Sequence, residues 1–278
     1  MKDVLIPTDF SANSWNALKY AIRLFEHEVC NFYILHIGDL RESVINSNSF
    51  TFPTEKIGPS IKEKLKLLFK KIDALQTTEK HHFIALQEYG NFIDVMRKTI
   101  EVKKVDLIVM GTTGASGIKA TVVGSNTGDV ITKVLCNVLV IPENAAAKIP
   151  ERIAFPTDYN LFYTYPILEA LTEILRISKA KLHVLNVSKS QSPLTVPQEV
   201  NKAYLQDYLG ETFPKTHSFH SISNKNISAA ILDFAANKQI EMLTMVAKNL
   251  NFFQKLLFDT SIEKLSFHTT VPLLVLHE

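Results

Sequence analysis

The chain has 278 residues, of which 46% are hydrophobic and 21% are charged. This composition is typical of a globular chain of one or two domains with a sizeable core. A formal net charge of +2 is too small to indicate a nucleic acid or an anionic membrane as partner.

Short apolar runs alternate with amphipathic helical stretches along the first half of the chain. This alternation predicts parallel βαβ construction. Because several of the apolar runs do not alternate with polar residues, they indicate strands buried on both faces. Residues 39–60 are polar, rich in Ser and Asn, and are expected to form a long loop. The expected strands are 4–8, 31–37, 82–86, 106–110 and 138–141, and the expected helices are 14–28, 61–75, 92–102 and 126–135.

The same order of elements then runs a second time, which indicates an internal duplication. The segment 153–158 (IAFPTD) repeats 4–9 (VLIPTD), and 182–187 (LHVLNV) repeats 32–37 (FYILHI). The apolar runs at 241–245 and 273–276 follow those at 106–110 and 138–141 at one constant offset. We therefore expect two five-stranded domains of ordinary size, 1–146 and 147–278.

The most informative segment is 109–125, which reads VMGTTGASGIKATVVGS. Four of the 9 glycines in the chain fall between Gly111 and Gly124. A strand that ends in glycine, followed by Gly124-Ser125 and a helix from Asn126, makes room for phosphates and aims backbone amides at them. This pattern indicates a nucleotide site, and the alternative is a glycine-rich surface turn. Neither a Walker loop nor a G-x-G-x-x-G fingerprint is present, so any nucleotide is held in another way.

Three patterns together resemble the universal stress protein family in its tandem form. They are PTD at the end of the first strand, LHI on the second, and V-M-G-x-x-G-x9-G-S across 109–125. The resemblance implies an α/β fold of two doubly wound, Rossmann-like parallel sheets with strand order 3-2-1-4-5. It also implies ATP at the carboxyl ends of the strands and pairing of the domains through their fifth strands.

Carried over residue by residue, the resemblance implies a set of nucleotide contacts at the ends of the strands and around the glycine segment. The position agrees with the general rule that ligands of open α/β sheets lie outside the strand carboxyl ends, where a helix amino terminus offers free amides. Asp9 is expected either to help hold Mg²⁺ between phosphates or to serve only as a turn or capping residue. The expected contacts are Pro7, Thr8, Asp9, Ile37, Met110, Gly111, Thr113, Gly114, Gly124, Ser125 and Asn126.

The second half departs from the nucleotide pattern. The residues at the positions of Gly111, Gly114, Gly124 and Ser125 are Val246, Asn249, Asp259 and Thr260. Val246 adds a branched side chain where bare backbone is needed, and Asp259 places a carboxylate where a phosphate would lie. Asp259 is instead expected to cap a helix through 263–267. We therefore predict that the second half keeps the fold and has lost the ligand.

The fifth strands of the two halves, Val138–Ile141 and Leu273–Leu276, are both apolar. An unpaired apolar edge strand invites aggregation. We therefore expect these strands to pair within the chain, so that the two halves form a pseudo-twofold dimer. Whether two such chains form a further homodimer stays open at this point.

No catalytic residue is predicted. No Ser-His-Asp order, G-x-S-x-G elbow or H-E-x-x-H motif is present. The histidines, including His81-His82 and His217 with His220, are expected to flank strands and to be structural or solvated. Three functions stay open: a nucleotide-dependent regulator, a slow ATPase or phosphotransferase that uses Asp9 and Mg²⁺, and an interaction module without nucleotide.

The spacing of the cysteines and the length of the apolar runs indicate the cell compartment. Cys30 and Cys136 show neither pairing nor metal spacing. The start, MKDVLIPTDF, has too short an apolar run for a signal peptide, and no stretch approaches transmembrane length. Cytoplasmic residence is the expectation.

Overall fold

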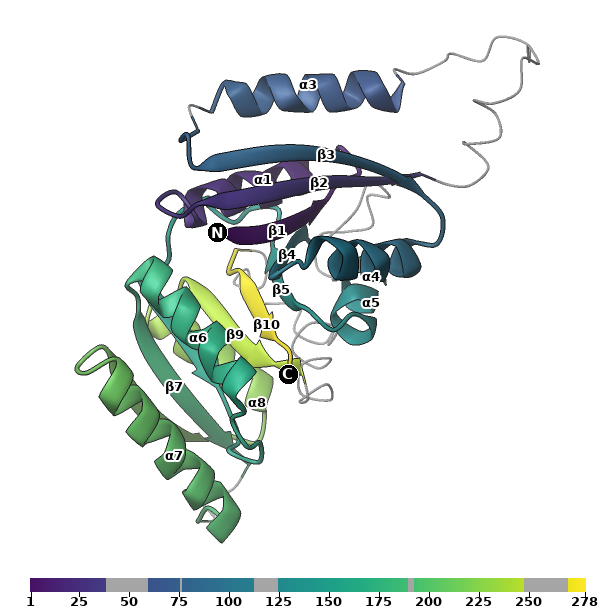
Figure 1. The fold of residues 1–278 in the computed structure, drawn as a ribbon. Coiled ribbons are helices and arrows are strands. Elements are labelled where there is room, and N and C mark those ends of the chain that lie inside the picture. Colours follow the sequence, from purple (N-terminus) through teal and green to yellow (C-terminus); the bar gives the residue numbers. More distant parts are fainter. Residues whose placement is uncertain (39–59, 76, 113–124, 190–192, 248–269) are drawn as a thin grey trace.

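The computed structural model describes residues 1–38, 60–75, 77–112, 125–189, 193–247 and 270–278 (Figure 1). Thr113, Gly114, Gly124, Asn249, Asp259 and Thr260 therefore lie outside the described residues. The described strands form one sheet of ten strands in the order β3-β2-β1-β4-β5-β10-β9-β6-β7-β8. Each half contributes five strands in the order 3-2-1-4-5, and the second half mirrors the first, so the predicted fold class is confirmed.

The first half follows the predicted order of elements. Three of its strands, β2, β3 and β5, extend one to three residues beyond the predicted runs, whereas β1 ends one residue before and β4 begins one residue after the predicted bounds. The first helix begins two residues earlier than expected, since Ser11 caps it by accepting a hydrogen bond from the Ser14 amide. The elements are β1 (Lys2–Pro7), α1 (Ala12–Leu24), β2 (Cys30–Gly38), α3 (Ile61–Asp73), β3 (His81–Tyr89), α4 (Phe92–Lys103), β4 (Leu107–Gly111), α5 (Ser125–Lys133) and β5 (Asn137–Ile141).

The second half repeats this order. Among the histidines that were expected to flank strands, His81 is the first residue of β3, one position before the expected strand 82–86, and His217 and His220 lie within β8. The elements are β6 (Arg152–Pro156), α6 (Tyr165–Ser178), β7 (Lys181–Ser188), α7 (Val196–Thr212), β8 (His217–Ser223), α8 (Ile227–Asn237), β9 (Met242–Val246) and β10 (Leu273–Leu276).

The core lies on both faces of the sheet. In β1, Val4 and Ile6 pack on the face covered by α1, α3, α6 and α7, whereas Leu5 packs on the face covered by α4, α5 and α8. All three side chains are fully buried. Burial on both faces explains why the strands lack polar alternation.

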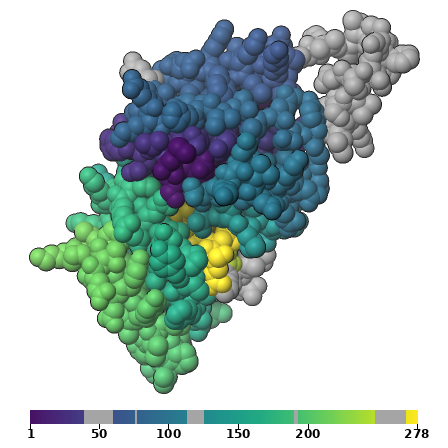
Figure 2. Space-filling view, viewed as in Figure 1, coloured from purple at the N-terminus to yellow at the C-terminus, as the bar shows by residue number. Residues whose placement is uncertain are grey.

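The two halves meet edge to edge through β5 and β10. These strands pair antiparallel, with Leu273 opposite Val140, Leu274 opposite Leu139 and Val275 opposite Val138. In Figure 2 the yellow carboxyl-terminal segment lies at the boundary between the purple-to-teal first half and the green second half. The pairing that the apolar edges predict is therefore confirmed, and each edge covers the other.

Side chains of both halves also fix the segment that connects them. The Asn16 amide on α1 donates to the backbone oxygens of Pro142, Glu143 and Ala145 at 2.9 to 3.2 Å. Glu241 accepts hydrogen bonds from Lys148 Nζ and from the Glu151 amide, each at 2.6 Å. The connection is thus held by directional contacts at both of its ends.

Two global features bear on function. Among the described residues, no helix combines the length and the apolar character needed to cross a membrane. Cys30 and Cys136 are buried free thiols, and burial raises the pKa of each to about 12. Neither thiol is therefore a ready nucleophile at neutral pH.

Candidate nucleotide site

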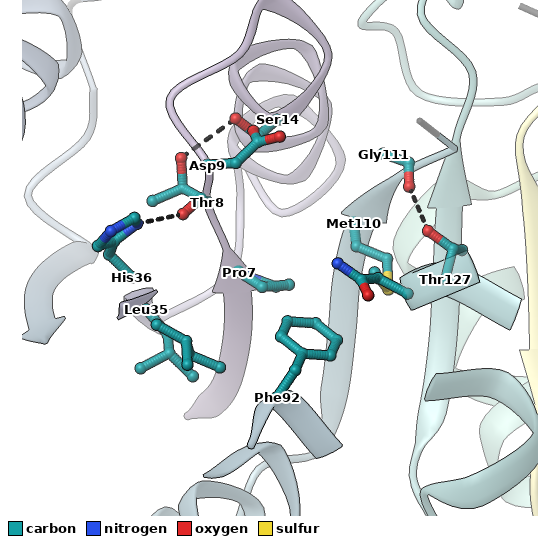
Figure 3. Close-up of a pocket in the computed structure, with 12 residues that line it drawn as sticks. Pro7, Thr8, Asp9, Ser14, Leu35, His36, Phe92, Met110, Gly111 and Thr127 are labelled. Carbon is teal, nitrogen blue, oxygen red and sulfur yellow. Dashed lines mark hydrogen bonds between the residues drawn. The ribbon is translucent and has the colours of Figure 1, made fainter. Parts of the chain in front are cut away.

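A cavity of about 140 Å³ opens at the carboxyl ends of β1, β2 and β4 in the first half (Figure 3). The amino-terminal residues of α1, α4 and α5 complete it. Strand ends and helix amino termini thus meet at one point of the sheet, where β1 lies between β2 and β4. The lining residues are Pro7, Thr8, Asp9, Ser14, Leu35, His36, Ile37, Phe92, Met110, Gly111, Asn126 and Thr127.

The segment after β1 is a tight turn held by its own side chains. Thr8 Oγ1 accepts from the Phe10 amide at 3.0 Å and lies 3.1 Å from Ser14 Oγ. Phe10 adopts a left-handed backbone with a φ of 64°. The Asp9 Oδ1 atom accepts from the Ser11 amide at 3.0 Å. Asp9 therefore acts as a turn residue in this structure, which was one of its two expected roles.

His36 supports this turn from β2. Its Nδ1 atom lies 2.9 Å from the Thr8 backbone oxygen, and its ring centroid lies 4.7 Å from that of Phe10. Among the described residues, no group of three or more His, Cys, Asp or Glu side chains could hold a metal ion. His36 thus helps to fix the turn that lines the cavity.

Gly111 is required by packing inside the protein. A Cβ atom at this position would lie 2.6 Å from Cγ of Asn13 and 2.7 Å from its Nδ2 atom. The Asn13 amide also donates to Thr112 Oγ1 at 3.4 Å. Sequence reasoning explained this glycine by the room that a nucleotide needs, whereas the structure shows that Asn13 of α1 occupies the space of the missing side chain.

The beginning of α5 is tied to the end of β4. Thr127 is buried, and its hydroxyl donates to the Gly111 backbone oxygen at 2.8 Å. Ser125 and Asn126 are the first two residues of the helix, and both are exposed. The first amides of a helix have no partner within the helix, and they carry the positive end of its dipole. The cavity therefore has an anion-attracting wall beside Asn126.

The family model for universal stress proteins matches residues 1–142 of the sequence. The chain belongs to the universal stress protein family. A universal stress protein of Methanocaldococcus jannaschii is 32% identical over 142 residues, which cover 50% of this chain and 81% of that relative.

Two solved structures match the chain over nearly its whole length. A universal stress protein from Archaeoglobus fulgidus has a TM-score of 0.65 at 17% identity and covers 99% of this chain and 96% of its own. A putative universal stress protein from Pseudomonas aeruginosa has a TM-score of 0.57 at 11% identity and covers 99% and 93%. These matches show the shared fold and support the tandem form of this universal stress protein.

The structure brings most of the described candidate residues together. Of those named from the sequence, Pro7, Thr8, Asp9, Ile37, Met110, Gly111 and Asn126 line the cavity, and Ser125 lies beside it at the start of α5. The lining residues that sequence reasoning missed are Ser14, Leu35, His36, Phe92 and Thr127. Figure 3 shows the Phe92 ring directed toward Pro7 and Met110. Of these five, Leu35 and His36 adjoin Ile37, and Thr127 follows Ser125-Asn126 directly, so these three carried a usable signal.

The second half of this universal stress protein repeats the turn. Thr157 Oγ1 accepts from the Tyr159 amide at 3.1 Å, and Tyr159 has a left-handed φ of 57°. Asp158 Oδ1 accepts from the Asn160 amide at 3.0 Å. The Asn186 amide donates to the Thr157 backbone oxygen at 2.9 Å, in the place that His36 takes in the first half. The fold expected for the second half is therefore present down to single hydrogen bonds.

The lining of the second hollow differs from that of the first. Tyr163 takes the place of Ser14, is 1% exposed, and lies with its hydroxyl 2.7 Å from Thr157 Oγ1. Val246, at the position of Gly111, is also buried. The hollow there measures about 120 Å³, and beyond Pro156, Thr157 and Asp158 its lining is apolar: Leu185, Val187, Ile227 and Ile231.

Proposed function

We propose that the first half of this protein binds ATP with Mg²⁺, and that nucleotide occupancy regulates a partner in the stress response without rapid turnover. The observation that carries the proposal is the cavity at the ends of β1, β2 and β4, which gathers residues of all three sequence patterns. Its shape and polarity suit a ligand with an aromatic part and an anionic part.

The apolar side of the cavity suits the base. Ile37, Phe92 and Met110 line it, and the ring of Phe92 offers an aromatic surface. In the proposed complex the Ile37 backbone meets the adenine, while Gly111, Thr113 and Gly114 line the ribose and the first phosphate.

The polar side suits the phosphates. Gly124, Ser125 and Asn126 would hold the later phosphates at the amino terminus of α5, where free amides and the helix dipole favour an anion. Asp9 lines the same cavity and would help to hold Mg²⁺ between the phosphates.

Regulation without rapid turnover is favoured by the acid–base groups of the site. Asp9 is the acidic residue among those that line the cavity, and one of its carboxylate oxygens takes part in the turn with Ser11. A fast phosphoryl transfer needs a positioned group that orients or deprotonates the nucleophile. A slow ATPase or phosphotransferase dependent on Asp9 is the second candidate, because Asp9 is among the residues that line the cavity.

We further propose that the second half binds no nucleotide. The supporting observations are the larger Tyr163 in the place of Ser14, with its hydroxyl 2.7 Å from Thr157 Oγ1, and the apolar lining of the second hollow. We place the protein in the cytoplasm, where ATP is plentiful and the two buried thiols stay reduced.

Calorimetric titration of the full chain with Mg·ATP tests the proposal. One site per chain is expected, and Gly124→Asp is expected to abolish it by placing a carboxylate against the phosphates. The matched control is Thr132→Ala on the exposed side of α5, which leaves the cavity unchanged. An absence of binding, or two equal sites, would contradict the proposal. A turnover assay on the same samples separates the regulator from the slow ATPase, since the ATPase requires hydrolysis that Asp9→Asn removes.

A further inference from the structure

Three polar side chains meet on the sheet of the second half, away from the nucleotide site. His183 lies on β7, and Ser218 and His220 lie on the neighbouring strand β8. The Nδ1 atom of His183 lies 3.3 Å from the Nε2 atom of His220. Ser218 Oγ lies 3.0 Å from the first nitrogen and 2.9 Å from the second. Two ring nitrogens and one hydroxyl oxygen thus face one small volume.

The spacing of the two nitrogens suits a metal ion. Imidazole nitrogens bind zinc at about 2.05 Å, so two of them on a tetrahedral ion lie about 3.3 Å apart. Both rings are held in place by Phe234 of α8, whose ring centroid lies 4.9 Å from that of His220 and 6.2 Å from that of His183. All three donor residues are half-buried, so solvent reaches the cluster.

The first half shows that the fold does not need polar groups at this place. His183 pairs in register with Ser218, and the corresponding pair of the first half is Tyr33 with Ile84. Two residues further along the outer strand, His220 corresponds to Leu86. The duplicated domain therefore fills the same positions with a tyrosine and two aliphatic side chains, and all three ligand atoms belong to the second half.

We propose that His183 and His220 bind a zinc-type divalent transition metal ion, with Ser218 Oγ and water completing a tetrahedral shell. Imidazole is a preferred donor for this class of metal, whereas Mg²⁺ and Ca²⁺ prefer oxygen. In the metal-free protein the Ser218 hydroxyl joins the two imidazoles by hydrogen bonds. Because β8 is the last strand of the sheet, the ion ties that strand to β7.

Positive charges around the cluster limit its affinity for a metal ion. Burial lowers the pKa of His183, and the charges of His220, Lys238, Arg152 and Lys181 lower it further. The pKa of His220 is lowered by burial and by Lys238. The same cations repel a second positive ion, so Lys238 holds the affinity down.

Calorimetric titration of the full chain with ZnCl₂, in the absence of nucleotide, tests this site. The expected result is one Zn²⁺ bound at the cluster, with no corresponding signal from MgCl₂. His183→Tyr and His220→Leu introduce the residues that the first half carries at these positions. Because loss of an outer-shell partner alone costs about 10- to 100-fold in metal affinity, removing one imidazole is expected to weaken Zn²⁺ binding more than about 100-fold.

Two further variants separate a metal ligand from a merely structural histidine. His217→Ala removes the adjacent ring, whose Nδ1 atom lies 3.0 Å from the Phe213 backbone oxygen, and should leave Zn²⁺ binding unchanged. Lys238→Gln should tighten binding, which no loss of folding can imitate. Mg·ATP binding should be the same in all of these variants, so failure of the nucleotide proposal is distinguishable from failure of this one.

The proposal is overturned if the unmodified chain binds no Zn²⁺, or if His183→Tyr and His220→Leu bind it as tightly as the unmodified chain. Should both of those variants unfold, Lys238→Gln decides, because unchanged Zn²⁺ affinity in that variant contradicts a metal beside Lys238. Thermal unfolding gives a second readout, since Zn²⁺ should raise the Tm of the unmodified chain, of His217→Ala and of Lys238→Gln, but not that of His183→Tyr or His220→Leu.

Discussion

Gly111→Ala should destabilise the protein because Asn13 occupies the space that the new methyl group needs. Replacing a glycine inside a strand by alanine ordinarily stabilises by about 0.5 to 1 kcal/mol. Here the added Cβ lies 2.6 Å from Asn13 Cγ, and Asn13 is only 4% exposed, so it cannot swing freely into solvent. Overpacking of this kind costs about 1 to 3 kcal/mol. We expect the free energy of unfolding to fall by that amount, measured by urea unfolding with the fluorescence of Trp15.

The matched control is the same substitution in an Asn13→Ala background. Removing the Asn13 side chain takes away the three atoms that lie nearest to the new Cβ. Gly111→Ala should then be neutral or stabilising, which gives a coupling energy of at least about 1.5 kcal/mol between the two positions. Equal costs in the two backgrounds would refute this account of the glycine. Mg·ATP affinity of the same variants, measured in parallel, shows whether nucleotide binding also requires a residue without a side chain at position 111.

Substitutions at three more positions test contacts of the two halves. Ser14→Tyr introduces the residue that the second half carries at this position, Tyr163. It should lower Mg·ATP affinity more than about tenfold, measured by calorimetry, and leave the fold intact. Unchanged affinity would show that Ser14 does not line a nucleotide site. His36→Asn should change the free energy of unfolding by no more than about 0.5 kcal/mol, since Asn186 makes the equivalent hydrogen bond to a backbone oxygen in the second half. His36→Leu, which removes that hydrogen bond, should lower the free energy of unfolding by about 1 kcal/mol. Equal losses in the two variants would argue against the hydrogen bond. Burial alone would raise the pKa of Glu241, but hydrogen bonds from Lys148 and the Glu151 amide and nearby positive charges lower it below its ordinary value. Its ionised form therefore stabilises the fold above that ordinary pKa, and Glu241→Gln should cost roughly 1 to 3 kcal/mol near pH 7. The cost should shrink progressively as the pH falls below that ordinary pKa, and a cost that does not change with pH would contradict this account.

The sequence predicted those parts of the fold that depend on local patterns. Apolar runs, the repeated PTD turn and the glycine segment gave the order of elements, the duplication and the family. Pro7 and Gly111 could be placed at the site because they stand directly at strand ends, where local turn chemistry is readable. The pairing of β5 with β10 followed from two apolar strands that would otherwise be exposed edges.

The features that the sequence did not predict depend on contacts between distant segments. Phe92 and Thr127 line the cavity from helices, and their spacing in the chain does not say which helix face meets the strand ends. The reason for Gly111 was missed because Asn13 precedes it by almost the whole first domain. His183 and His220 lie 37 residues apart and come together only through the register of β7 and β8.

The covalent link across β5 and β10 frees the two copies from symmetry. In an assembly of identical subunits every substitution appears at both sites at once, so a change that spoils one pocket spoils the other. Within a single polypeptide the copies are inherited together in a fixed ratio, yet each can accumulate its own changes. Side chains of the carboxyl-terminal copy, such as Tyr163 and His220, can therefore differ from Ser14 and Leu86 of the first copy without altering the amino-terminal pocket.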